Sequence, residues 1–474
     1  MSRVCKRVAL VLVAVVMALT AFGCGKGDDI EPGATVVTVW FRDFEDWSNS
    51  VLKSIMDDFN KDKTDGLHIS YRFITDDSFG DALAAAQDNN AAPDIYQVSY
   101  TNLYSEVRNQ TVLALDELLP QTAFDDLKDS AKELVTYNGH YYAYPELTEP
   151  SAVMYYRKDL LQAAGVDYSD AESWSFADLY AACQKLKTTM PKRQGKYPML
   201  GFDFGQAGWS TQGLQANLTG GDVCLTEDWT QIIVKSQPYK ELAAFFAELY
   251  SNEYVPAAWS TGYNDQIIDL CDGKAAIVYT GSWGIAEIME TYGESMAAKI
   301  GVATIPTLAG GNNKGTTATS GGWSFVIDAK SKNPQAAAKI VEYMAAGEDT
   351  TAPERYFKAA HYSKSIPRTS IQQKIDAADI SSSCPPEWLT VISDIADHAI
   401  PESIYTFDIN TQLVGLLQGI AIDSLDGIDV DTSWNNRIDD VVSEMQKIMD
   451  NNQLAGNNPR LKTAWTEEGI EHEC

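Results

Sequence analysis

Apolar residues in the first hundred positions follow two alternating periods. Three short apolar runs are typical of buried strands: residues 36–41 (VVTVWF), 68–74 and 94–98. Between these runs, apolar residues repeat at helical spacing, at Val51, Leu52, Ile55, Met56 and Phe59 and then over the alanine-rich residues 79–89. This order predicts a parallel sheet covered by helices. Loops that follow such strands meet at one edge and build the ligand site, which points to residues 42–45 and 99–102.

The rest of the chain continues this mixture of strands and helices. A capping box at Ser175 and Asp178 predicts the start of a helix. The turn Gly281-Ser282-Trp283-Gly284 joins an apolar strand to a helix with Ile285, Ile288, Met289 and Tyr292 on one face. Further strands or helices are predicted at residues 198–203, 262–272, 275–280, 299–305, 323–328, 334–346 and 385–451. Because so long a body exceeds one ordinary core, we expect two α/β lobes that exchange segments.

The first residues have the pattern of an export signal. Three basic residues precede a nearly unbroken apolar run from Val8 to Phe22, which is short for a membrane span. The run ends at Ala-Phe-Gly-Cys, which resembles the bacterial lipobox. We therefore expect a signal peptide at residues 1–23, lipidation of Cys24 and a tether at residues 24–35. A plain secreted protein with an incidental cysteine is the alternative.

Net charge limits the partners that the protein can bind, and the cysteines limit its disulfides and metal sites. The 474 residues carry a formal net charge of −30, which becomes −33 once the signal and its three basic residues are removed. Such an acidic surface repels nucleic acid and anionic lipid, so neither is an expected partner. After Cys24, five cysteines remain, with no metal-like spacing, at positions 183, 224, 271, 384 and 474. The sequence allows a single disulfide without assigning its partners, but it does not indicate a disulfide framework.

Enzyme motifs were sought and not found in the sequence. The turn around Ser282 is not G-x-S-x-G, and the five histidines form no zinc pattern. No phosphate-binding loop is present. We therefore expect no catalytic residue, no metal and no cofactor. A glycan-active hydrolase with two catalytic carboxylates is the alternative that the motifs leave, because an acidic chain offers many carboxylate pairs.

Aromatic side chains are abundant, with 11 tryptophans and 23 tyrosines. Four tryptophans follow small residues in turns rather than at helical core spacing: Trp209, Trp259, Trp283 and Trp323. For any one of them, core packing is the competing interpretation. Small neighbours would leave the rings uncovered, and an exposed ring beside polar groups suits the apolar face of a sugar.

Taken in order, several segments resemble the family 1 extracellular solute-binding proteins of ABC importers, of the maltodextrin-binding type. The resemblance covers nearly all of the mature chain and rests on the lipobox, VVTVWF, LAAAQDNNAAPDIYQV, YNGHYYAYPELTEPSAVMYYRKDLLQAAGVD, Ser173-Trp174-Ser175, DGKAAIVYTGSWGIAEI, KIGVATIPTLAGG and SGGWSFVIDAKSKNPQAAAKIVEYM. His140 and Arg157 depart from the family pattern.

The resemblance implies an α/β, two-lobed periplasmic-binding-protein-like fold, each lobe a mostly parallel sheet flanked by helices, with crossing hinge strands. The first lobe would comprise residues 36–149 and 305–347, and the second 150–304 and 348–474. Crossings would lie near Glu149, near residues 304–306 and near residues 347–353.

The family's site positions fall on Arg42, Asp43, Glu45, Ser99, Tyr100, Glu149, Gln206, Trp209, Trp259, Trp283 and Trp323. Glu146 rivals Glu149, because one extra residue separates this chain from the family pattern. Trp283 matches the family's stacking tryptophan, which implies that a ligand rather than the protein covers its ring.

The function implied is a monomeric, non-enzymatic receptor on the outer face of the bacterial cytoplasmic membrane. It would touch the membrane only through its lipid anchor, capture a carbohydrate and deliver it to the transmembrane subunits of an ABC permease. Alternatives are the same fold with a polyol, a glycerol phosphate or a peptide as ligand, and a lipid-anchored hydrolase.

Overall fold

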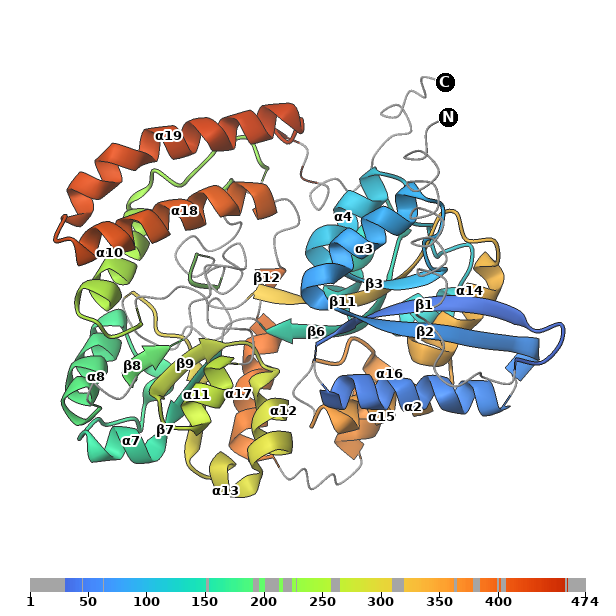
Figure 1. The fold of residues 1–474 in the computed structure, drawn as a ribbon, viewed down its shortest axis with the longest axis horizontal. Coiled ribbons are helices and arrows are strands. Elements are labelled where there is room, and N and C mark those ends of the chain that lie inside the picture. The colour runs from blue at the N-terminus through green and yellow to red at the C-terminus, as the bar shows by residue number, and fades with distance from the viewer. Residues whose placement is uncertain are drawn as a thin grey trace, which may run out of the picture.

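A computed structural model of the chain shows two lobes side by side, each built on one β-sheet (Figure 1). The structure describes residues 30–44, 46–62, 64–150, 153–190, 196–200, 213–215, 224–226, 228–256, 265–308, 319–361, 365–377, 384–398, 400–401, 406–456 and 458. The signal, Cys24 and the first half of the expected tether, up to residue 29, lie outside these residues. No helix in the described part is both long and apolar enough to cross a membrane.

The first lobe contains a six-stranded sheet in the order β12-β11-β3-β1-β2, with β6 also paired to β11. Its strands are β1 (Thr35–Asp43), β2 (Leu67–Thr75), β3 (Ile95–Ser99), β6 (Tyr144–Pro150), β11 (Thr319–Ile327) and β12 (Ile400–Pro401). The strands β1, β2 and β3 are parallel, as the βαβ pattern predicts. Alternate β1 residues point into a core that also contains Leu52, Ile55, Met56 and Phe59 of α2, which confirms the predicted helix face.

Helices and short strands complete the first lobe. They are α2 (Asp46–Asp62), η1 (Thr64–Gly66), α3 (Asp76–Asp88), α4 (Tyr100–Arg108), α5 (Gln121–Asp125), α6 (Asp129–Val135), β4 (Thr136–Tyr137), β5 (His140–Tyr141), α14 (Pro334–Val341), η6 (Glu342–Ala346), α15 (Thr351–Ala359) and α16 (Thr369–Ala377). Helices α3 and α4 lie on the opposite face of the sheet from α2 (Figure 1).

The second lobe contains a four-stranded sheet in the order β10-β7-β9-β8. Its strands are β7 (Val153–Arg157), β8 (Tyr197–Leu200), β9 (Ala275–Thr280) and β10 (Ile300–Thr304). Only β8 and β9 pair in parallel, whereas β7 is antiparallel to both β9 and β10. The expectation of a mostly parallel second sheet is therefore wrong. The apolar runs indicate buried strands, but both directions of pairing bury the same side chains.

Helices surround the second sheet. They are α7 (Lys158–Ala163), η2 (Ala171–Ser173), α8 (Phe176–Thr189), α10 (Gln237–Ser251), α11 (Asp265–Cys271), α12 (Gly284–Glu287), η5 (Ile288–Tyr292), α13 (Glu294–Ala297), α17 (Pro386–His398), α18 (Thr406–Leu425) and α19 (Val430–Asn451). The capping box of α8 is present, since Ser175 accepts from the Asp178 backbone and the Asp178 side chain accepts in return. The helix after Gly284 is also present, and its second part, η5, is π-helical.

The chain passes from the first sheet to the second between Pro150 and Val153, and returns between β10 and β11. The expected third crossing near residues 347–353 does not occur there, because the helices that come next, α15 and α16, still belong to the first lobe. Tyr356, Phe357 and Ile371 pack in the core of the first lobe, so the chain leaves that lobe only after α16. The salt bridge from Arg368 to Asp126 ties the start of α16 to the end of α5 in the first lobe.

The C-terminal helices α18 and α19 pack against each other and against α10, at one end of the second lobe (Figure 1). Helix α17 instead contacts both β10 and β6, and so touches one strand from each sheet. Cys183, Cys224, Cys271 and Cys384 are buried free thiols, so these four form no disulfide, while Cys474 lies outside the described residues.

Candidate ligand-binding site

The ends of β1, β3 and β6 bring several of the predicted residues together. Arg42 and Asp43 close β1, Ser99 closes β3, and Tyr100 begins α4 directly after it. Because β1 and β3 are parallel neighbours, their carboxyl ends lie at the same edge of the sheet. Glu149 approaches this edge from β6, which runs antiparallel to β11 and ends in the crossing to the second lobe.

Arg42 is the best-defined cation at this edge. Its guanidinium carbon lies 4.3 Å from the centre of the Phe79 ring and 4.6 Å from that of Trp323. Nη1 forms a salt bridge with Asp76. Burial lowers the pKa of Arg42, and the Asp76 carboxylate partly opposes that effect. Nε is buried and has no hydrogen-bond partner among the described residues, so this donor is unsatisfied in the ligand-free structure.

The Trp323 ring is held by a backbone irregularity in β11. Gly322 has φ +133°, and a Cβ there would overlap the Leu147 carbonyl oxygen of β6. The pairing of β11 with β6 shifts register directly after Trp323. The half-buried ring then lies against Arg42 and, at 4.8 Å between ring centres, against Phe44. Trp323 therefore anchors the guanidinium, beyond any contact that it makes with a ligand.

Gln97 connects Arg42 to a carboxylate that the sequence offered only as a rival. The Gln97 side chain accepts from the Arg42 backbone N–H at 2.7 Å and donates to Glu146 Oε2 at 2.6 Å. Gln97 and Glu146 are both buried. A glutamine inside the apolar strand IYQVS was a visible signal, because a buried amide needs partners on both of its ends.

Tyr100 lies within electrostatic range of both candidate glutamates. Its hydroxyl donates to the Leu147 carbonyl at 2.9 Å, and the side chain is fully buried. Burial raises the pKa of Tyr100 well above its ordinary value, and the charges of Glu146 and Glu149 raise it further. The phenol therefore stays protonated and neutral beside both carboxylates.

Glu149 also reaches toward the second lobe. The pKa of Tyr155 is raised by burial and then by the Cys384 thiol and the Glu149 carboxylate, so Glu149 lies within electrostatic range of β7. The Tyr155 hydroxyl donates to the Gly281 carbonyl at 2.8 Å, which ties β7 to the turn that carries Trp283. The buried Glu149 thus stands where the first lobe gives way to the second.

The Trp283 ring is not left uncovered. Only 1% of this residue is exposed, so the protein itself covers the ring and the expectation of an open stacking face is wrong. A Cβ at Gly281 would overlap the six-membered part of the ring. A Cβ at Gly284 would lie 2.8 Å from Ile267 Cδ1 and 3.0 Å from Tyr155 Cζ. The small residues make room for close packing rather than for a ligand.

Two other predicted residues have local structural partners. The Ser99 side chain accepts from the Asn102 backbone N–H as the N-cap of α4 and lies 2.9 Å from the Thr101 hydroxyl. Asp43 is exposed and accepts from the Asn49 side chain. Glu45, Gln206, Trp209 and Trp259 lie outside the described residues. No cluster of three or more potential metal ligands occurs in the described ranges.

Comparison with known proteins is consistent with this arrangement. Residues 45–349 match the family model of bacterial extracellular solute-binding proteins. A maltooligosaccharide ABC transporter solute-binding lipoprotein of Streptococcus pneumoniae serotype 4 is 26% identical over 368 residues, covering 73% of this chain and 78% of that protein. A mannitol-binding protein of Pseudomonas aeruginosa is 28% identical over 219 residues, covering 45% of this chain and 47% of that protein.

A solved structure shares the fold at low sequence identity. The GacH receptor of Streptomyces glaucescens, determined unliganded and in complex with acarbose and an acarbose homologue, superposes with a TM-score of 0.70. It is 20% identical, and the match covers 89% of this chain and 99% of that one. At this identity the likeness concerns the two-lobed architecture.

Proposed function

The chain belongs to the family of bacterial extracellular solute-binding proteins, and from that premise we propose that it captures an oligosaccharide between its lobes and delivers it to an ABC permease. As a member of this family it is a carrier and not an enzyme. The maltooligosaccharide-binding relative and the acarbose-binding structural neighbour support a carbohydrate ligand.

The observation that carries the proposal is the constellation of Arg42, Trp323, Glu146 and Glu149 at one edge of the first sheet. A sugar hydroxyl both donates and accepts, so its recognition needs donors and acceptors side by side. Arg42 supplies donors, and Nε has no protein partner in the described part. The two buried glutamates supply acceptors, and Trp323 supplies an apolar surface.

A thermal-shift screen against mono- and oligosaccharides tests this function. A ligand at 100 times its dissociation constant adds about 2.7 kcal/mol to the free energy of unfolding. We expect maltooligosaccharides to raise the melting temperature. Glu146→Gln and Glu149→Gln should reduce the shift, whereas the exposed Glu117→Gln serves as the matched control. If no carbohydrate raises the melting temperature, or if the protein hydrolyses its ligand, the proposal fails.

A polyol is the second candidate, because a mannitol-binding protein is among the relatives. The same screen separates the two candidates when mannitol and sorbitol are included. Stabilisation by a linear polyol, with no response to any oligosaccharide, would replace the proposed ligand class while leaving the carrier function intact.

Ligand capture should close the two lobes. Lobes joined by short crossings are expected to rotate about these crossings, and a ligand shifts the equilibrium only by binding the closed state better. Small-angle scattering should therefore show a smaller radius of gyration with a confirmed ligand. An unchanged radius would argue against hinge closure.

Anchoring through a lipid on Cys24 completes the proposal, with a monomer on the outer face of the cytoplasmic membrane. The lipoprotein among the relatives supports this placement. Cys24→Ser should release the protein from the membrane fraction, because the variant lacks the residue that would carry the acyl chains on which stable attachment depends. Equal membrane retention of the variant would contradict a lipid anchor at this residue.

A further inference from the structure

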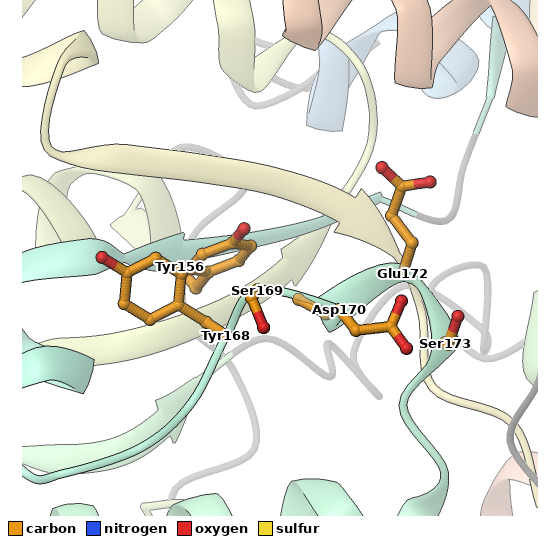
Figure 2. A pocket seen from close by; sticks show the side chains of 7 residues that line it. Tyr156, Tyr168, Ser169, Asp170, Glu172 and Ser173 are labelled. Carbon is orange, nitrogen blue, oxygen red and sulfur yellow. The ribbon is translucent and has the colours of Figure 1, made fainter.

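A second concavity lies in the second lobe, apart from the residues predicted for the ligand site. It is a pocket of about 290 Å³, lined by Tyr156, Tyr168, Ser169, Asp170, Ala171, Glu172 and Ser173. Figure 2 shows the two tyrosine side chains together at one side and Asp170, Glu172 and Ser173 at the other. Neither the family resemblance nor the proposed function assigns a role to these residues.

The tyrosine side of the pocket depends on a glycine in the neighbouring strand. Tyr156 of β7 stands opposite Gly301 of β10. A Cβ at Gly301 would overlap Cζ of the Tyr156 ring, so the ring lies directly over the strand. Glycine inside a strand weakens it and often marks a site where another group approaches closely. Here it gives Tyr156 a fixed place in the pocket wall.

The Tyr156 hydroxyl is a polar group that lacks a partner. The residue is only 8% exposed, and its hydroxyl makes no hydrogen bond to the described part of the chain. Burial raises the pKa of Tyr156 to about 12, and the charges of Glu172 and Tyr168 add to the effect, so the hydroxyl stays protonated at neutral pH. The hydroxyl oxygen can therefore accept a hydrogen bond from a ligand in the pocket.

The remaining wall is aromatic and acidic. Tyr168 lies 5.7 Å from Tyr156 between ring centres, with an interplanar angle of 49°, so the rings form a corner rather than a flat platform. Asp170 and Glu172 bring two carboxylates, and none of the seven described residues that line the pocket is basic. Cations are attracted both to the faces of aromatic rings and to carboxylates.

Local hydrogen bonds hold the loop that carries these groups. The Ser169 backbone and hydroxyl both donate to Asp167, at 3.0 Å and 2.8 Å. The Ser173 backbone N–H donates to the Asp170 carbonyl, and the Thr304 hydroxyl donates to the Glu172 carbonyl at 3.1 Å. The pocket is therefore tied to the end of β10 and does not need to form when a ligand arrives.

We propose that this pocket binds an organic cation, an ammonium or guanidinium group, with its charge toward Asp170 and Glu172 and its apolar part against Tyr156 and Tyr168. The tilted rings argue against a pyranose, which packs on one flat aromatic face. The acidic lining favours a positive ligand over a neutral one.

Titration calorimetry of the full-length protein with choline, agmatine and the neutral carbon isostere of choline, dimethylbutanol, tests the proposal. We expect at least one cation to bind at least tenfold more tightly than the isostere, because removal of the charge removes its attraction to the rings and carboxylates. Tyr168→Ala and Glu172→Gln should each weaken cation binding severalfold, and Glu117→Gln should not. Melting curves of the variants establish that they are folded.

Three results would overturn the proposal: neither cation binds, the neutral isostere binds equally well, or both variants bind the cations unchanged. Glucose is included as a neutral sugar of similar size. Tyr168-dependent binding of glucose without cation binding would make the pocket a sugar subsite instead. Because oligosaccharide binding at Arg42 and Trp323 is measured separately, failure here leaves the proposed carrier function untouched, and the reverse also holds.

Discussion

Trp323 in the first lobe and Trp283 in the second both follow glycines, but these glycines act differently. Gly322 allows a left-handed backbone where β11 approaches β6, and Trp323 ends half-buried over Arg42. Gly281 instead lies under the Trp283 ring itself, which is almost fully buried. The same sequence pattern thus places one tryptophan at an edge and the other inside.

The difference shows what a small residue before a tryptophan indicates. The missing side chain creates space, and the backbone decides whether a ligand, another strand or the tryptophan itself fills it. At Trp323 the space admits the Leu147 carbonyl, whereas at Trp283 it admits the indole ring. Exposure of a ring cannot be inferred from its neighbours alone.

The largest expected effect is on stability, at Trp283. Trp283→Ala should lower the free energy of unfolding by about 3–5 kcal/mol, because removal of a buried tryptophan leaves a cavity. Denaturant unfolding of the empty protein measures this loss. If stability hardly changed while carbohydrate affinity fell, the ring would be a ligand platform and the contrast between the two tryptophans would break.

Gly281→Ala should cost about 3 kcal/mol, at the upper end for overpacking, since the new Cβ takes the place of the ring. A double-mutant cycle with Trp283→Ala sharpens this expectation. When the ring is absent, the added methyl group should cost much less, so the two effects should be strongly non-additive. Additive losses would mean that the ring and Gly281 do not compete for space.

Gly322→Ala should destabilise the protein by about 2 kcal/mol, because a side chain at this φ is strained and would overlap the Leu147 carbonyl. To relieve this overlap, β11 should move away from β6, which should displace Trp323 from Arg42 and weaken carbohydrate binding. The control is Gly80→Ala, which has open space around the new Cβ in helix α3 and should cause no loss. Equal stability of the two variants would contradict the strained bulge.

Trp323→Ala should act mainly on binding. We expect a loss of about 1–2 kcal/mol in carbohydrate affinity, roughly five- to thirtyfold, as for an aromatic contact at a binding site. Trp323→Phe should recover part of it, because a smaller aromatic face remains for Arg42. Calorimetry on both variants provides the comparison. An unchanged affinity for the alanine variant would remove Trp323 from the site.

The sequence predicted the first sheet well because its strands are apolar runs with helices between them. β1, β2 and β3 appear within two residues of the predicted bounds. The direction of pairing in the second sheet could not be predicted, since β7 and β10 come from distant segments. The third crossing was misplaced because the apolar face of α15 would fit either lobe, and the Asp126–Arg368 contact that fixes it is long-range.

The site was predicted in outline. Arg42 and Ser99 could be expected at strand ends, because parallel strands direct their following loops to one edge. Gln97 was missed, although a buried amide within an apolar strand was a usable signal. The choice between Glu146 and Glu149 could not be made, since β6 buries both and the register with β11 depends on the bulge beside Trp323.

The most direct test of the central claim is calorimetry of a maltooligosaccharide with Arg42→Gln and Arg72→Gln side by side. Both arginines lie over a tryptophan, Arg42 at 4.6 Å from Trp323 and Arg72 at 4.7 Å from Trp40. Arg42 differs in its place at the strand end and in its buried Nε, which has no partner among the residues that the structure describes. We predict that Arg42→Gln weakens binding at least tenfold, as loss of a charged hydrogen bond does, while Arg72→Gln binds as the unaltered protein does. Equal affinities of the two variants would contradict a carbohydrate site at this edge.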